Sequence, residues 1–329
     1  MKRPIAQIVG VGRALPRRAL MNAEFPAMGI DTSDEWIIER TGIRQRYIAG
    51  PGETVSSLGA EASRRAMDHA GVAASEVDAI VVATSSPDRL LPAAAVELQA
   101  AIGATRAAAF DIMAACAGWV YGLSVGEGLL ATGAAETVLV VGAEKMSTII
   151  NWTDRATCVL FGDGAGAVVL RRSRQQKGIL SLFIRSDGNL SNLLQRPKGG
   201  STEPVTVEMV AAREHLVTMA GRETFKHAVR SMADACDRAL DGAKLSYADI
   251  DLLIPHQANI RIIEATAKHA NVPMEKVFVN VDRYGNTSAA SIPIALSEAM
   301  EQGRVLDGST VMFVAFGAGL TWASAIHRF

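Results

Sequence analysis

The sequence predicts an α/β protein of two similar halves, which would span residues 1–175 and 176–329. Three observations support this fold class: a repeated helix-turn-strand segment, a repeated glycine-rich segment, and a composition suited to dense packing. Hydrophobic residues make up 49% of the chain and charged residues 20%, which excludes an intrinsically disordered protein. The 29 glycines and the low aromatic content of 5% are typical of closely packed helices and strands.

The first repeat joins an amphipathic helix to a short buried strand. Residues 66–72 align without gaps with residues 239–245, and residues 76–81 align at the same offset with residues 249–254. The helices expected to precede the two turns lie at residues 61–70 and 222–240. The strand segments are apolar and rich in β-branched residues, as in sheets that helices cover on both faces.

The second repeat pairs Phe161-Gly-Asp-Gly-Ala-Gly166 with Phe316-Gly-Ala-Gly319, each followed by a predicted strand that ends in arginine. Neither segment is a dinucleotide-binding fingerprint, because the glycine spacing differs and a strand rather than a helix follows. Chance can produce one such match, but two matches in the same order favour a duplicated α/β unit.

The remaining elements follow from local patterns. Residues 1–12 carry two basic residues and only a very short apolar run, so they predict a first strand rather than a signal peptide. Residues 107–113 predict a strand, and residues 119–131 are apolar almost all round, which predicts a buried helix. Residues 171–206 are expected to link the halves, with an exposed loop at 196–204.

The charge balance and the apolar segments exclude several classes of protein. Lysine plus arginine number 33 and aspartate plus glutamate 34, so the net charge of −1 argues against a nucleic-acid-binding protein that acts through a global positive field. The longest apolar region, residues 107–135, contains Asp111, Glu127 and several glycines, and is too interrupted to span a bilayer. We therefore expect a cytoplasmic protein that binds neither nucleic acid nor membrane.

The three cysteines are too few and too scattered for a disulfide framework, and no C-x-x-C pair predicts a zinc site. Cys158 and Cys236 lie in apolar or helical segments and are expected to be packing residues. Cys116 falls between the predicted strand and the apolar helix. A thiol at a helix N-terminus lies near backbone N–H groups and the positive end of the helix dipole, which favours the thiolate. The alternative is that Cys116 is a small buried apolar residue, as most free cysteines are.

Three further positions can carry chemistry, although each also has a structural interpretation. His256 follows the strand of the second repeat, and the carboxyl ends of strands are where open α/β sheets bind ligands. Asn286 lies in a Gly-Asn pair that is ordinarily a turn signal. The short side chains of Phe316-Gly-Ala-Gly319 let backbone N–H groups approach a ligand closely.

Taken together, Cys116, His256, Asn286 and the terminal Gly-x-Gly resemble the β-ketoacyl-acyl-carrier-protein synthase III family of the thiolase superfamily. The resemblance runs through nearly the whole chain. Its specific blocks are Asp31-Thr-Ser-Asp-Glu-Trp-Ile37, Arg40-Thr-Gly-Ile-Arg44, Asp111-Ile-Met-Ala-Ala-Cys-Ala-Gly118, Phe161-Gly-Asp-Gly-Ala-Gly166, Pro255-His-Gln-Ala-Asn-Ile-Arg261, Gly285-Asn-Thr-Ser-Ala-Ala290 and Phe316-Gly-Ala-Gly-Leu-Thr-Trp322. The resemblance implies a five-layered αβαβα fold of two duplicated halves, in agreement with the repeats.

The resemblance also implies a reaction and roles for these residues. Cys116 is expected to attack an acyl-CoA primer, such as acetyl-CoA, and to form an acyl-enzyme. Malonyl-acyl carrier protein then loses CO₂, and its carbanion attacks the acyl group to give 3-ketoacyl-acyl carrier protein, which initiates type II fatty acid synthesis. His256 and Asn286 are expected to hydrogen-bond the enolate, while the backbone N–H groups of Cys116 and Ala318 form the oxyanion hole. No metal or cofactor is implied, since acyl-CoA is a substrate.

The family's CoA site carries over to Trp36 and Arg155, which are expected to sandwich the adenine, with Thr32 and Arg40 nearby and Asn259 on the pantetheine arm. Stacking of a purine between an indole and a guanidinium is physically reasonable. From the residues alone, Trp36 also fits a surface-helix position and Arg155 a solvated charge.

Two surfaces depend on the resemblance alone. The basic patch for the acidic carrier protein carries over to Lys226, Arg261 and Lys268, whereas His269 stands where some relatives have a further lysine. Leu91 occupies the position that, in the family, reaches across a homodimer interface and caps the partner's acyl pocket. Some relatives have Phe there, so Leu91 is expected to admit a longer or branched primer.

Several alternatives stay open. Thiolase is not among them, because it needs a second cysteine in the C-terminal glycine loop, which Gly317-Ala-Gly319 lacks. Elongating synthases are also excluded, because they use Cys-His-His and the third residue here is Asn286. A related acyltransferase or ketide-forming condensing enzyme of secondary metabolism shares most of the blocks and differs in its acyl acceptor. A non-catalytic acyl-CoA-binding homologue is a further alternative, against which the intact Cys-His-Asn set argues. The sequence does not settle primer length or carrier protein.

Overall fold

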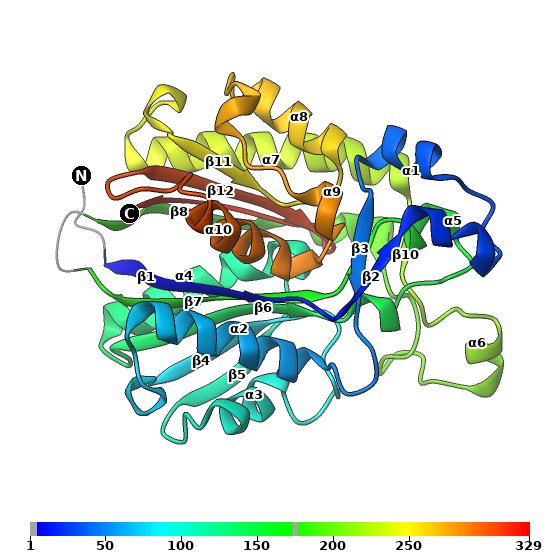
Figure 1. Ribbon diagram of the computed structural model, residues 1–329, viewed down its shortest axis with the longest axis horizontal. Coiled ribbons are helices and arrows are strands. Elements are labelled where there is room, and N and C mark those ends of the chain that lie inside the picture. The colour runs from blue at the N-terminus through cyan, green and yellow to red at the C-terminus, as the bar shows by residue number, and fades with distance from the viewer. Residues whose placement is uncertain (1–4, 174–176) are drawn as a thin grey trace.

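Two β-sheets form the centre of the fold, one in each part of the chain (Figure 1). The computed structural model describes residues 5–173 and 177–329. The expected boundary between the halves falls at residues 175 and 176 and lies outside the described residues. The five-stranded sheet is ordered β1 (Ala6–Ala14), β7 (Gly164–Arg172), β6 (Thr137–Glu144), β4 (Ala79–Ala83), β5 (Ala108–Ile112). The four-stranded sheet is ordered β11 (Leu252–Pro255), β12 (Thr310–Gly317), β13 (Thr321–Arg328), β8 (Gly178–Ser186).

Helices form three layers around these sheets, which confirms the predicted five-layered αβαβα arrangement (Figure 1). The outer layers are α2 (Val55–Ala70) with α3 (Ala94–Ile102), and α7 (Gly221–Ala243) with α8 (Ile260–His269). The central layer between the sheets is formed by α4 (Gly118–Thr132) and α10 (Ser291–Glu301). Apolar clusters fill the spaces between the layers, and Trp119 of α4 packs edge-on against Phe313 of β12 in the central one.

Shorter elements gather at the end of the molecule that carries the site. The helices are α1 (Asp34–Thr41), α5 (Arg155–Cys158), α6 (Val207–Ala211) and α9 (Val281–Tyr284). The strands are β2 (Arg18–Met21), β3 (Gln45–Ile48), β9 (Leu194–Gln195) and β10 (Thr218–Met219). The fully buried Arg46 of β3 joins this region to the core, since its guanidinium donates to the Leu20 and Val159 carbonyls and to Asn22.

The helix-turn-strand repeat predicted from the sequence is present in both parts. In each copy a long helix leads through a 3-10 turn, η3 (Ala74–Glu76) or η7 (Tyr247–Asp249), into a buried strand. An acidic side chain, Glu76 or Asp249, accepts a backbone N–H at the start of each turn. The strands begin at Ala79 and Leu252, three residues after the starts of the aligned segments, because Glu76 and Asp249 belong to the turns.

The expected linker at residues 171–206 is wrong in part. Residues 178–186 form β8, an edge strand paired with β13, and only its first residues are fully buried. The polar segments on either side of it, rather than its own pattern, led to the prediction of a linker. Residues 197–206 do form an exposed irregular segment. Among the described residues, the helices are all too short or too polar to cross a membrane.

A buried histidine joins the two sheets. His327 of β13 is fully buried, and its Nε2 accepts the backbone N–H of Ile8 in β1 at 2.9 Å. Burial lowers the pKa of His327 to about 3, so the ring is neutral in the folded protein. In the unfolded chain the same ring titrates near pH 6.5.

We predict that His327 makes the fold acid-sensitive. Below about pH 6.5 the unfolded state binds a proton that the folded state does not, so stability falls as the pH falls. Chemical unfolding of the wild-type protein and of His327→Gln, which retains an acceptor for Ile8, should be compared at pH 7.5 and pH 5.5. The wild type should lose about 1.4 kcal/mol more than the variant over this interval. An equal loss in both proteins would contradict the prediction.

Candidate active site

Cys116 lies at a sharp turn between strand and helix, as predicted. After β5 the chain forms η4 (Ala115–Ala117) and then enters α4. Ala115 has a φ of 46°, in the left-handed region that costs a non-glycine residue about 1–2 kcal/mol. This turn places Cys116 two residues before the packed helix, with its side chain buried. Cys158 and Cys236 are buried and unbonded to other cysteines, as expected of packing residues.

Burial opposes the thiolate that the helix N-terminus favours at Cys116. Burial raises the pKa of its thiol to about 12, and the buried Glu144 carboxyl opposes the thiolate further. The Ser288 hydroxyl and the backbone N–H of Cys116 favour the thiolate, but they do not offset the loss of water. Burial therefore favours the neutral thiol of Cys116 in this site.

His256 follows β11 directly and is held from two sides. Its backbone N–H donates to the Val314 carbonyl at 2.8 Å, and its Nδ1 lies 2.6 Å from the Ser291 hydroxyl. That hydroxyl also accepts the backbone N–H of Gln257 at 3.4 Å, so its own proton points to Nδ1. Because burial lowers the pKa of His256 to about 3, the ring is neutral and carries its proton on Nε2.

Asn286 lies in the tight turn that the Gly-Asn pair predicts, and the turn also anchors its side chain. Gly285 has a φ of 64°, and a Cβ there would lie 2.9 Å from the Leu160 carbonyl. The Asn286 backbone N–H donates to that same carbonyl at 2.8 Å. Its Oδ1 accepts the backbone N–H of Ser288 at 2.8 Å, which leaves the Nδ2 donor group for the cavity.

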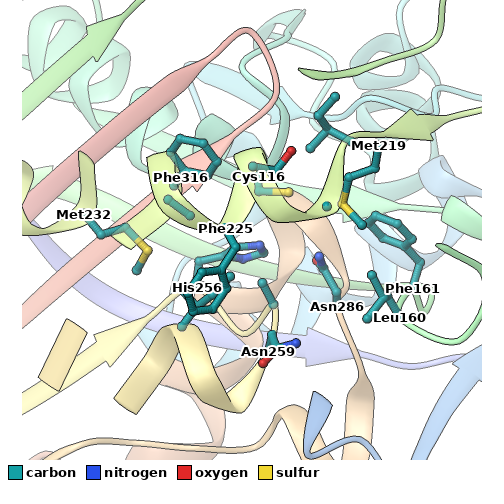
Figure 2. A pocket seen from close by; sticks show the side chains of 16 residues that line it. Cys116, Leu160, Phe161, Met219, Phe225, Met232, His256, Asn259, Asn286 and Phe316 are labelled. Atoms are coloured by element: carbon teal, nitrogen blue, oxygen red, sulfur yellow. The ribbon is translucent and has the colours of Figure 1, made fainter. Parts of the chain in front are cut away.

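Cys116, His256 and Asn286 line one cavity of about 120 Å³ (Figure 2). The apolar part of its wall comes from Leu160, Phe161, Met219, Phe225 and Met232. A second pocket of about 610 Å³ also reaches Cys116. Its apolar wall includes Leu90, Met113, Met146, Ile149, Leu194 and Val217. The thiol therefore stands where a narrow cavity meets a wider apolar pocket.

The glycine loop after β12 lies directly on the Cys116 turn. A Cβ at Gly317 would lie 2.6 Å from the backbone nitrogen of Cys116 and 3.1 Å from that of Ala117. Ala318, the next residue, lines the wider pocket. Only a glycine at position 317 allows the two backbone segments to come this close.

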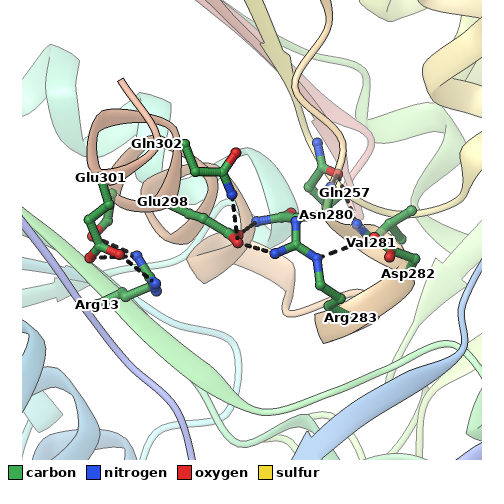
Figure 3. A network of polar contacts seen from close by, with 10 residues as sticks. Arg13, Gln257, Asn280, Val281, Asp282, Arg283, Glu298, Glu301 and Gln302 are labelled. Atoms are coloured by element: carbon green, nitrogen blue, oxygen red, sulfur yellow. Dashed lines mark hydrogen bonds and ion pairs between the residues drawn. The ribbon is translucent and has the colours of Figure 1, made fainter. Parts of the chain in front are cut away.

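A buried polar network holds the segment between His256 and Asn286 (Figure 3). Gln257 uses both ends of its amide: Oε1 accepts the backbone N–H groups of Asn280 and Val281, and Nε2 donates to the Pro255 and Phe278 carbonyls. Glu298 of α10 then binds the Asn280 amide and the Arg283 guanidinium. The loop that carries Asn286 is thus fixed to both β11 and α10.

The residues expected to bind CoA adenine gather around one indole ring. The guanidinium carbons of Arg40 and Arg155 lie 4.5 and 4.7 Å from the Trp36 ring centroid. Arg155 also donates to the Asp31 carbonyl oxygen at 2.6 Å. Because a purine needs about 3.5 Å on each side of its plane, Arg155 must move before adenine stacks between it and Trp36. Thr32 Oγ1 is buried and has no hydrogen-bond partner among the described residues.

Comparisons with known proteins identify the family of this chain. The family models for 3-oxoacyl-[acyl-carrier-protein] synthase III and for its C-terminal part match residues 110–188 and 240–329. β-Ketoacyl-[acyl-carrier-protein] synthase III of Roseiflexus castenholzii is 54% identical over 323 residues, with 98% of each chain covered.

Solved structures give the same result. The crystal structure of 3-oxoacyl-[acyl-carrier-protein] synthase III from Aquifex aeolicus has a TM-score of 0.91 and 43% identity, covering 98% of this chain and 100% of that one. The priming β-ketosynthase of the R1128 polyketide pathway has the same TM-score with 36% identity, covering 99% and 97%.

The chain belongs to the β-ketoacyl-acyl-carrier-protein synthase III family. The predicted family, fold class and activity are confirmed: this synthase III is an acyltransferase that initiates fatty acid synthesis. The alternative of a non-catalytic homologue is set aside. The polyketide enzyme has the same TM-score as the synthase III of Aquifex aeolicus, so the fold alone does not separate the two groups.

The other predicted residues of this synthase III lie on two neighbouring helices and one loop. Asn259 caps α8, and its amide donates to the Arg40 carbonyl at 3.0 Å. Lys226 of α7 pairs with Glu223, while Arg261 of α8 donates to the Glu39 carbonyl. Lys268 stands in the last turn of α8. Leu91 is 86% exposed on the loop before α3.

Sequence reasoning missed three polar residues of the site. Ser288 contacts the Cys116 sulfur at 3.5 Å, Ser291 contacts His256, and the buried Glu144 affects the Cys116 pKa. The two serines lie in the block Gly285-Asn-Thr-Ser-Ala-Ala290 or directly after it, so their position was a signal. Glu144 ends a strand that is otherwise apolar, which was the only hint of its role.

We predict that Gly317→Ala destabilises the fold and displaces the nucleophile. Its methyl group would overlap the Cys116 backbone, which should lower the free energy of unfolding by about 1–3 kcal/mol. Gly128→Ala is the matched control, since Gly128 is exposed in α4 and a Cβ there meets nothing within 4 Å. The control should be more stable than the wild type by about 0.5–1 kcal/mol. Chemical unfolding measures both, and equal stability of the two variants would refute the steric argument.

Proposed function

We propose that Cys116 accepts the acyl group of an acyl-CoA and that malonyl-acyl carrier protein is decarboxylated and condensed with it at the same site. The observation that carries this proposal is the shared cavity of Cys116, His256 and Asn286, to which three different segments contribute. A thiol nucleophile beside two neutral hydrogen-bond donors suits an acyl transfer followed by formation of an enolate.

His256 and Asn286 act as neutral donors to the thioester oxygen of the malonyl group. The Ser291 contact supports the Nε2–H tautomer of His256, and the Ser288 contact supports an Asn286 amide that presents Nδ2. As CO₂ leaves, the electron pair of the broken bond forms an enolate whose oxygen accepts both hydrogen bonds. A donor that is neutral and held in place stabilises this charge without first being reoriented.

The backbone N–H groups of Cys116 and Ala318 form the oxyanion hole for acyl transfer. The close contact between Gly317 and the Cys116 backbone supports this role, because it brings the two segments together. In enzymes of this kind the loss of one such donor costs about 3 kcal/mol of transition-state stabilisation. Ala318 contributes its backbone only, so its methyl side chain is compatible with the role.

The CoA and carrier-protein sites lie along the entrance to the cavity. Adenine stacks between Trp36 and Arg155 once Arg155 has moved, with Arg40 and Thr32 beside it. Asn259 lines the cavity, in keeping with a contact to the pantetheine arm.

An acidic carrier protein docks on the basic residues of α7 and α8. These residues are Lys226, Arg261 and Lys268. The packing of α7 against α8 supports a docking surface shared by these two helices. We place the enzyme in a reducing cytoplasm, with three unbridged cysteines as support.

The wider pocket holds the acyl chain, and the enzyme works as a homodimer in which Leu91 caps the partner's pocket. The exposure of Leu91 and Leu90, at 86% and 87%, supports an apolar loop that a second copy covers. A flexible leucine leaves more room than phenylalanine, which favours longer or branched primers over acetyl groups alone.

Acylation of Cys116 is tested by intact-protein mass spectrometry. After mixing with acetyl-CoA or octanoyl-CoA, the wild type should gain the mass of one acyl group, because the buried thiol attacks the thioester. Cys116→Ala should gain nothing, whereas Cys236→Ala, which removes a buried cysteine outside the cavity, should react like the wild type. An adduct on Cys116→Ala would refute the assignment of the nucleophile.

Primer selection is tested with acetyl-, isobutyryl- and octanoyl-CoA. The wild type should turn over at least one of the two larger primers, and Leu91→Phe should reduce its use relative to acetyl-CoA by roughly tenfold because the cap becomes bulkier. Light scattering should give the mass of two chains for both proteins. Strict acetyl preference of the wild type would contradict the role of Leu91.

A further inference from the structure

A buried carboxyl group, that of Glu144, lies near Cys116. Glu144 ends β6 and is fully buried. Its Oε2 accepts hydrogen bonds from the Ser86 hydroxyl at 2.5 Å, the Ser85 backbone N–H at 3.0 Å and the Thr84 hydroxyl at 3.3 Å. Its Oε1 has no partner at hydrogen-bond distance among the described residues.

No cation neutralises this carboxyl group within the described part of the chain. The neighbouring Lys145 turns away, and its Nζ donates to the Glu53 carbonyl at 2.8 Å. A buried carboxyl without a cation binds a proton more readily than one in water, and burial indeed raises the pKa of Glu144. A fold rarely keeps such a group unless it serves a purpose.

The unpartnered side of Glu144 faces the loop that carries Asn286. A Cβ on Gly142, two residues earlier in β6, would lie 2.3 Å from the Ala289 carbonyl oxygen, so this loop lies directly on the end of β6. The Ser288 hydroxyl and the Ala289 backbone N–H lie near enough to the carboxyl group to lower its pKa, although neither is within hydrogen-bond geometry of Oε1. Ser288 is therefore close to both Glu144 and Cys116.

The hydrogen bond between Cys116 and Ser288 has the direction that proton transfer towards Glu144 needs. The Cys116 thiol donates to the Ser288 hydroxyl oxygen at 3.5 Å, so the serine proton is available for the carboxylate. Ser288 has a φ of 49°, an uncommon conformation for this residue, and it is held there by the hydrogen bond from its backbone N–H to Asn286. The side chain is thus fixed between the thiol and the carboxyl group.

We propose that Ser288 and Glu144 form a relay that takes the proton from the Cys116 thiol during acylation. The inference rests on the proposed function and extends it to the proton. Ser288 touches the reacting sulfur, and Glu144 acts through Ser288 as a positioning and proton-holding residue. His256 is then free to keep its Nε2 proton for the enolate.

The step balances in atoms and charge. As the sulfur of Cys116 bonds to the carbonyl carbon of acyl-CoA, the thiol proton passes to the Ser288 oxygen and the Ser288 proton passes to Glu144. When the tetrahedral intermediate collapses, the bond from carbon to the CoA sulfur breaks. The proton returns along the same path to the departing CoA thiolate, so the products are acyl-Cys116 and CoA thiol.

The two half-reactions test the relay. Glu144→Gln is isosteric and Ser288→Ala keeps the backbone N–H that holds Asn286, so both variants should fold, which thermal unfolding checks. With saturating acetyl-CoA or octanoyl-CoA, each variant should acylate at least about 100-fold more slowly than the wild type. Release of CO₂ from malonyl-acyl carrier protein without an acyl donor should keep its wild-type rate, because that step does not remove the thiol proton. The double variant should be no slower than the slower single variant.

Ser86→Ala is the comparison variant: it removes a hydrogen bond to the other oxygen of Glu144 but keeps the carboxyl group, so it should slow acylation less than Glu144→Gln does. If Glu144 only supports the fold, Ser86→Ala and Glu144→Gln will act alike and both half-reactions will slow together, which overturns the relay. Acylation of Glu144→Gln at the wild-type rate also overturns it while leaving the proposed function intact. Failure of the wild type to form any adduct overturns both.

Discussion

Close contacts between the two parts of the chain at three glycines govern the geometry of this synthase III. Gly142, Gly166 and Gly317 each lie against backbone of the other part of the chain, at distances where a Cβ would come within 2.3–2.7 Å of another atom. Backbone therefore touches backbone around Cys116, and no flexible side chain sets the spacing. Since Cys116 and the pair of His256 and Asn286 come from different parts of the chain, these contacts fix their separation.

Burial then determines how the polar groups of the site work. Burial raises the pKa of the Cys116 thiol and lowers that of the His256 ring, and both shifts favour the neutral form. In the proposed reaction, negative charge is consequently stabilised by oriented N–H dipoles and amides, whose effect is strong in a buried site. The cost is that the thiol proton needs an acceptor, for which the structure offers a buried carboxyl group within reach of a serine.

Local patterns were sufficient for much of the fold and for the principal site residues. The strand before Cys116, the apolar helix after it and the turn at Asn286 are short-range features, so the sequence predicts them well. The burial of the Cys116 thiol was not predictable, because the groups that cover it come from the loop at residues 285–291 and from the Gly317 segment, both distant in sequence. Glu144 escaped notice for the same reason: its significance depends on Ser288, which reaches it only in the folded chain.

Asn259 shows how binding and architecture are joined in this enzyme. Its Oδ1 begins α8 and its Nδ2 holds the end of α1, the helix that carries Trp36, while the residue also lines the cavity. A change at this one amide therefore loosens the helix expected to meet the carrier protein together with the helix expected to meet the nucleotide. Loss of turnover in an Asn259 variant is accordingly not a measure of one substrate contact, because the same amide also joins α8 to α1.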